Sequence, residues 1–166
     1  PYPTLFPYTT LFRSDPRCAV VHSLIRVQPE PGCNDPRQLV SNLPWQQEIF
    51  KRGNYIDAMA LVRRRAWQAV GGFQHIPGGW EDFDFWCCLI EAGWHGVCLA
   101  QVVCSYVVHN QSMLTTKTNS NLRKLCRLLQ HRHPWLNLNP NTTNPNSGVH
   151  HKEDPNFRGS AALERM

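Results

Sequence analysis

One segment limits the fold of this chain more than any other: an apolar helical pattern that begins directly after two glycines. Over residues 82–92, Phe83, Trp86 and Ile90 fall on one helical stripe, and Phe85, Leu89 and Ala92 fall on the stripe beside it. Apolar side chains therefore cover most of the circumference, which is typical of a helix buried in a core. Gly93 follows in the position of a C-terminal helix cap. The sequence thus predicts a buried helix over residues 82–92 at the centre of the fold.

Three carboxylates mark the start of this helix. Glu81, Asp82 and Asp84 are three of only twelve acidic residues in the chain, and they lie within four positions. A carboxylate at a helix N-terminus can cap the helix, bind a metal or accept a proton. The residues alone leave these three roles open, and for Asp82 they favour the helix cap.

The first residues have a pattern of a different kind. Residues 4–14, with the sequence TLFPYTTLFRS, match the translation of a common DNA-sequencing adapter. We therefore expect residues 1–14 to be an adapter-derived artefact and exclude them from fold prediction.

Length and composition predict one globular domain. The chain has 166 residues and a mean hydropathy of −0.42, and it contains no apolar run near the roughly 20 residues that cross a bilayer. From residue 135 onward Asn, Pro and Thr dominate, and such a segment buries too little apolar surface to fold alone. We predict a domain over residues 15–134 and a flexible tail over residues 135–166.

The formal charge of +5 is concentrated in Arg63–Arg65 and in the run from Arg123 to Arg132. A basic patch can attract nucleic acid, an anionic membrane surface or a phosphorylated small molecule. No nucleic-acid motif accompanies it, so the sequence favours a solvated face and predicts no nucleic-acid partner. Peripheral membrane association stays open.

The seven cysteines are odd in number and form no CxxC pair. Cys87, Cys88 and Cys98 lie in apolar surroundings, where a thiol packs as a small hydrophobic group. This use of cysteine favours a reducing compartment, hence the cytoplasm, over a disulfide framework. Their spacing also offers no zinc-binding pattern.

The remaining elements follow from periodicity and from Gly and Pro positions. We expect strands over 18–27, 54–62, 94–99 and 102–108, the last two consecutive in the chain. Short helices are predicted within 36–51 and over 63–70, the latter closed by Gly71-Gly72, with a basic amphipathic helix over 118–131.

Four segments in this order resemble one known family. They are AWQAVGGF at 66–73, GWEDFDFW at 79–86, EAGW at 91–94 and VVHNQSM at 107–113. Together they resemble the C-terminal half of a family 2 glycosyltransferase. The resemblance implies an α/β domain: a partial GT-A fold, with a mostly parallel sheet and flanking helices, that lacks its N-terminal βαβ units.

The resemblance also implies a reaction: transfer of a sugar from a nucleotide-diphospho-sugar to an acceptor hydroxyl, with inversion. The acceptor would be a sugar, a lipid-linked molecule or a polysaccharide. Asp82 matches the catalytic base of the family's Glu-Asp motif. Glu81 would orient the loop or the acceptor, or else be a solvated carboxylate. Trp80 could stack on a sugar ring or simply pack in the core.

Two further residues are candidates for the donor side. Arg63 could bind a phosphate, although such arginines are more often solvated. His109, directly after a predicted strand, could join a Mn²⁺ or Mg²⁺ ion or remain a surface histidine. The family's metal-binding Asp-x-Asp motif lies upstream of the matched region. The only Asp-x-Asp after residue 14 is Asp82-Phe83-Asp84, which opens a buried helix and in which Asp84 should point away from Asp82.

Two other functions remain alternatives. One is an inactive fragment, or an acceptor-binding module without catalysis. The other is a small metal-binding protein that uses Asp82, Asp84 and His109.

Overall fold

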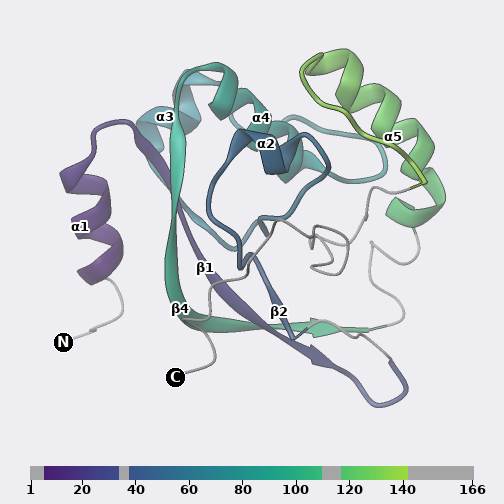
Figure 1. The fold of residues 1–166 in the computed structure, drawn as a ribbon, viewed down its shortest axis with the longest axis horizontal. Coiled ribbons are helices and arrows are strands. Elements are labelled where there is room, and N and C mark those ends of the chain that lie inside the picture. Colours follow the sequence, from purple (N-terminus) through teal and green to yellow (C-terminus); the bar gives the residue numbers. More distant parts are fainter. Residues whose placement is uncertain (1–5, 34–37, 110–116, 142–166) are drawn as a thin grey trace.

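The computed structural model describes residues 6–33, 38–109 and 117–141 (Figure 1). In chain order the elements are α1 (Phe6–Ser14), β1 (Cys18–Pro29), β2 (Leu39–Val40), α2 (Gln47–Phe50), β3 (Leu61–Val62), α3 (Arg64–Ala69), α4 (Glu81–Glu91), β4 (His95–Val108) and α5 (Asn119–Arg132). The chain is therefore a mixed α/β protein, as predicted.

The sheet is built around β1. It pairs in parallel with β4 along its whole length, and in antiparallel fashion with β2 at Ile25 and with β3 at Val20. The sheet is thus mixed, and the expectation of a mostly parallel sheet is wrong in that respect. β4 is one strand instead of the two predicted, and it bends sharply along its course (Figure 1). Shifts in its pairing with β1 next to Leu24 supply the irregularity that such a bend requires.

The predicted central helix is confirmed. In α4 the side chains of Phe83, Phe85, Trp86 and Leu89 are completely buried. Trp86 meets the ring of Trp45 edge-on, with 5.9 Å between ring centroids. Burial on several faces explains why so many of its positions are apolar.

Glycine ends both α3 and α4 in the same way. The N–H groups of Gly71 and Gly72 donate to the carbonyls of Gln68 and Trp67, and those of Gly93 and Trp94 donate to Ile90 and Leu89. Gly71, Gly72 and Gly93 all have positive φ. This pairing of the last carbonyls is the Schellman motif, so the predicted glycine caps are confirmed.

The segment predicted as a strand over 54–62 is mostly irregular, and only Leu61–Val62 pair with β1. Tyr55 explains the difference: its hydroxyl donates to the Pro44 carbonyl and accepts from the Gln46 N–H, at 2.9 Å each. Bonds of this kind hold the segment without a strand ladder.

Both ends of the described chain contribute to the core. In α1, Leu11 and Phe12 pack against Cys18 and Val21; the adapter origin of this segment stays a prediction. At the other end, Leu136 and Leu138 are buried although they belong to the predicted tail. Residues 142–166 of that predicted tail lie outside the described residues.

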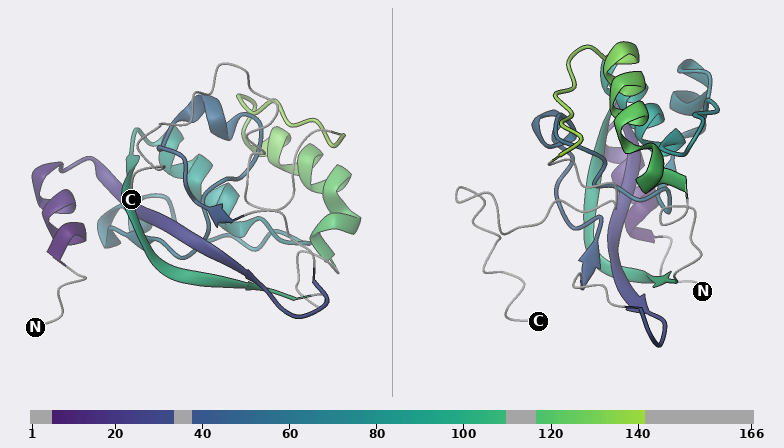
Figure 2. Two further views of the ribbon diagram at one scale, coloured as in Figure 1. Left: turned by 60° about the horizontal axis from the view of Figure 1, so that its bottom comes forward. Right: turned by 90° about the vertical axis from the view of Figure 1, so that its right-hand side faces the viewer.

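Helix α5 is amphipathic as predicted. Its Leu125, Cys126 and Leu129 are buried, while Arg123, Lys124 and Arg127 are exposed. α1 and α5 lie at opposite ends of the molecule (Figures 1 and 2). None of the helices in the described ranges has the length and apolar character that crossing a membrane demands.

Candidate functional site

The candidate site lies at the N-terminus of α4. Trp80 is the cap residue of this helix, and Asp82 is its second residue. Asp82 therefore does not occupy the N-cap position that the sequence favoured. Its Oδ1 accepts the N–H of Phe83 at 2.8 Å, so it still satisfies one of the unpaired N–H groups of the first turn. Asp82 sits where a carboxylate can serve both the helix and a reaction.

Asn54 fixes the other oxygen of Asp82. The Asn54 amide donates to Oδ2 at 2.8 Å, and its own oxygen accepts the Ile56 N–H at 3.3 Å. The Trp86 indole then ties the same loop to α4 by donating to the Ile56 carbonyl. Asn54 is buried and 28 positions away in sequence. Sequence reasoning missed this residue because nothing marks an isolated Asn as a partner of a distant Asp.

The same loop places a second carboxylate near the site. The Asp57 N–H donates to the hydroxyl of Ser41 at 2.7 Å, and Ser41 itself has a positive φ of 54°. Burial is the main cause that raises the pKa of Asp82 to about 6, and the negative charge of Asp57 adds to it. The hydrogen bonds from Asn54 and Phe83 oppose the shift without cancelling it. Asp82 is thus a stronger base than an ordinary aspartate.

Trp80 has two unfavourable features next to Asp82. Its backbone is left-handed, with φ of 72°, a conformation that a bulky side chain rarely adopts. Its indole N–H is buried with no hydrogen-bond partner, which costs free energy. Strain of this kind concentrates at functional sites. The ring is 5% exposed and meets Phe83 edge-on, so it packs in the core and offers no open face for a sugar.

Glu81 lies at the rim of the site. Its side chain is 34% exposed, and one oxygen is 3.9 Å from Nδ1 of the exposed His75. This agrees with a solvated carboxylate and leaves Glu81 accessible to a bound molecule.

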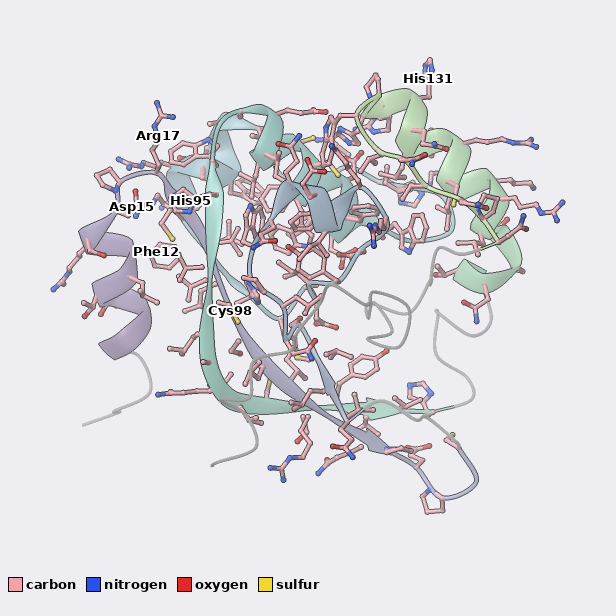
Figure 3. All side chains as sticks on the ribbon, viewed as in Figure 1. Phe12, Asp15, Arg17, His95, Cys98 and His131 are labelled. Carbon is pink, nitrogen blue, oxygen red and sulfur yellow. The ribbon has the colours of Figure 1, made fainter. Side chains whose placement is uncertain are left out.

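Arg63 has a structural role. Its guanidinium donates to the carbonyls of Cys18 at 2.7 Å, of Asp15 at 3.0 Å and of Phe12, and it stacks over the Phe12 ring. These contacts hold α1 and β1 against α3. Figure 3 shows Phe12 and Asp15 at the α1 end of the molecule, far from His131 at the end of α5. The structure thus gives no support to Arg63 as a phosphate ligand.

His109 follows the last residue of β4 and is half-buried. Among the described residues no contact joins it to Asp82 or Asp84. Its neighbours from Asn110 to Thr116 lie outside the described residues. The structure therefore does not bring together the metal-ligand set Asp82, Asp84 and His109.

Asp84 points away from Asp82, as predicted, and belongs to a separate buried cluster. Its carboxylate pairs with Arg132 and accepts from Nε2 of His133 at 3.0 Å. In the described ranges, ligand atoms of Asp84, Cys88 and His133 lie within 4.8 Å of one another. This set has one oxygen, one sulfur and one nitrogen donor, whereas Mg²⁺ and Mn²⁺ favour oxygen ligands. It does not fit the metal that the resemblance implies, and we derive no step through such an ion.

The chain matches none of the protein-family models against which it was compared, and no curated protein is similar to it.

Proposed function

We propose that this chain is the acceptor side of an inverting glycosyltransferase and that Asp82 is its catalytic base. The observation that carries the proposal is the orientation of the Asp82 carboxylate. It is held by Asn54 on one oxygen and by the Phe83 N–H on the other, at 2.8 Å each, beside a strained Trp80. The order of helices and strands from α3 to β4, together with the parallel pairing of β1 and β4, supports a partial GT-A fold.

The geometry suits proton abstraction. Each carboxylate oxygen has two lone pairs, so Asp82 keeps an acceptor position after its two hydrogen bonds. An acceptor hydroxyl bound there would give its proton to Asp82 as its oxygen attacks the anomeric carbon of the donor sugar. The bond to the nucleoside diphosphate breaks in the same displacement, which inverts the configuration. A base whose pKa is about 6 is mostly ionised at pH 7 and still binds a proton firmly.

The other roles follow from position. Glu81, at the exposed rim, would orient the acceptor, and Trp80 would fix the backbone that carries Glu81 and Asp82. The donor would be a nucleotide-diphospho-sugar, and the acceptor a sugar, a lipid-linked molecule or a polysaccharide. A cytoplasmic location is part of the proposal, supported by the absence of a disulfide from all seven cysteines.

The test is nucleoside-diphosphate release by the purified full chain, with a panel of nucleotide-diphospho-sugars and simple sugar acceptors. We expect Asp82→Asn to lower turnover by about 10²–10⁴-fold. Glu48→Gln is the matched control, because Glu48 is an exposed carboxylate that pairs only with Lys51 among its described contacts. Turnover should also rise with pH up to about 6 and then level off. An Asp82→Asn variant with full turnover would reject the proposed base.

A second candidate is an acceptor-binding module without catalysis. It is favoured by one observation: the described residues bring no cation or oxygen-rich ligand set to Asp82 that could hold a diphosphate. Saturation-transfer NMR with the same acceptors separates the two candidates. The binding module would be supported by two results together: the unmodified chain binds the sugar but shows no turnover, and Asn54→Ala weakens this binding. The absence of both turnover and sugar binding would reject both candidates.

A further inference from the structure

A buried cluster joins α4 to α5, away from the contacts of Asp82. Asp84 and Cys88 are four positions apart, so they lie on one face of α4. His133, the residue after α5, faces them with Nε2. Asp84 is fully buried, and the His133 side chain is 3% exposed. Figures 1 and 2 show α4 and α5 as neighbours.

We propose that Asp84, Cys88 and His133 form a zinc site that fastens α5 to α4, and that Arg132 occupies the place of the metal in the metal-free chain. The three ligand atoms, all within 4.8 Å of one another, could converge on one ion with little movement. Carboxylate, thiolate and imidazole together are a ligand set that zinc accepts, with a water in the fourth position.

The surroundings of His133 support this assignment. Its Nδ1 lies 2.8 Å from Oε1 of Glu91, and the same oxygen accepts the indole N–H of Trp135 at 2.8 Å. A carboxylate on the outer nitrogen of a metal-binding histidine fixes the ring and directs the other nitrogen to the metal. Glu91 thus provides the support that a zinc-bound His133 needs.

Zinc binding changes the charges of the cluster by a small amount. Both nitrogens of His133 face carboxylates, so the ring carries two protons and a positive charge in the metal-free chain. With Arg132 and His133 positive, and Asp84 and Glu91 negative, the cluster is neutral while Cys88 remains a thiol. Zinc would displace the Nε2 proton of His133 and the thiol proton of Cys88. Two positive charges enter as Zn²⁺ and two leave as protons, and the Arg132 charge moves into solvent, so zinc, its three ligands and Glu91 together carry one negative charge.

Arg132 is the competitor of the metal in this scheme. Its guanidinium pairs with both oxygens of Asp84, with Nη2 at 3.0 Å from Oδ2. The Arg132 side chain is 36% exposed, in contrast to the buried Asp84 and His133, so it can swing into solvent when the metal binds. Removal of Arg132 should therefore strengthen zinc binding.

The test uses the full chain, stripped of metal with a chelator and kept reduced. Co²⁺ serves as the spectroscopic probe, because a thiolate ligand gives it a charge-transfer absorption, and Zn²⁺ is then added in competition. We expect the absorption to appear with the unmodified chain, to be lost in Cys88→Ser, and to persist in the control Cys104→Ser, since Cys104 lies on β4. Arg132→Gln should bind zinc about tenfold more tightly.

Glu91→Gln is a second variant in case Cys88→Ser fails to fold, because Glu91 is on the exposed side of the cluster, with 40% of its side chain accessible. We expect it to weaken zinc binding by about 10–100-fold. Absence of the absorption in the unmodified chain would overturn the proposal. The proposal would also be overturned if Cys88→Ser bound zinc as tightly as the unmodified chain does, because the metal would then be bound adventitiously by other histidines and cysteines.

Discussion

At the scale of single residues, Asp82 is expected to destabilise the folded chain at neutral pH. Its pKa is raised from 3.8 to about 6, so the folded state binds its proton more tightly than the unfolded state does. The pKa shift of Asp82 leaves the free energy of unfolding unaffected below pH 4. It lowers this free energy as the pH rises from 4 to 6, and by a constant amount above pH 6. A cost of this sign is common for residues retained for function instead of stability.

Asp82→Asn should therefore stabilise the protein by about 1 kcal/mol at pH 7.5 and by almost nothing at pH 4. The gain is smaller than the full pKa shift implies, because Asp82 is partly exposed and Asn loses one of the two hydrogen bonds to Asn54 and Phe83. Urea unfolding at both pH values, in buffer with a chelator, measures the difference. Glu48→Gln again serves as the control. An equal change at both pH values would contradict the raised pKa.

The residue scale also shows what a local pattern can indicate. The sequence points to Glu81, Asp82 and Asp84 because acidic residues at the start of an apolar helix form a local pattern, and their roles stay predictions. Asn54 and His133 were missed, since they approach the two aspartates from positions 28 and 49 residues away. Likewise, cysteine spacing cannot indicate the zinc site that we propose, because the partners of Cys88 there are a carboxylate and an imidazole and not other cysteines.

At the scale of elements, the helix ends allow a matched test. Gly72 and Gly93 belong to the same motif at the ends of α3 and α4, with Gly72 one position further along it, and they have nearly the same φ, 70° and 75°. A Cβ at Gly93 would meet only an Arg17 nitrogen, at 3.8 Å, whereas a Cβ at Gly72 would lie 2.4 Å from the Trp67 ring. The two glycines therefore differ in crowding and not in backbone conformation.

Gly93→Ala should cost about 1 kcal/mol, which is the price of a left-handed non-glycine residue. Gly72→Ala should cost about 2–4 kcal/mol, because displacement of Trp67 is added. Chemical denaturation of both variants measures the two values. Equal costs would show that Trp67, which is 42% exposed, moves aside freely.

The elements also explain which secondary structure could be predicted. α3 and α4 were located within a residue or two, because apolar periodicity and glycine caps are local signals. The strand expected over 54–62 was wrong, since Asn54 and Tyr55 bond to distant groups in place of a neighbouring strand. The sequence predicts two strands in place of the single bent β4, because Ala100 and Gln101 interrupt the apolar pattern; the pairing with β1 also shifts there, from Leu99 opposite Ser23 to Val102 opposite Leu24, but the strand continues.

At the scale of the whole molecule, the segment after α5 closes the core. Leu136 and Leu138 are buried, and the N–H of Asn137 donates to the carbonyl of Lys51 at 2.9 Å. Composition predicts a domain boundary at residue 134, because Asn and Pro dominate the segment that follows. Composition does not register that its two leucines are two positions apart and can face the same side. Among the described residues, the core instead extends to Leu138.

A chain that ends at residue 134 should consequently be much less stable than one that ends at residue 141. Each buried leucine contributes about 2–5 kcal/mol by analogy with truncation to alanine, so loss of both approaches the whole stability of a typical domain. Urea unfolding and proteolysis of the two forms measure the difference, and Leu61→Ala in the longer form is the control, because Leu61 is 40% exposed. Equal stability of the two forms would mean that Leu136 and Leu138 contribute little, and that α4 is covered sufficiently by α5 alone.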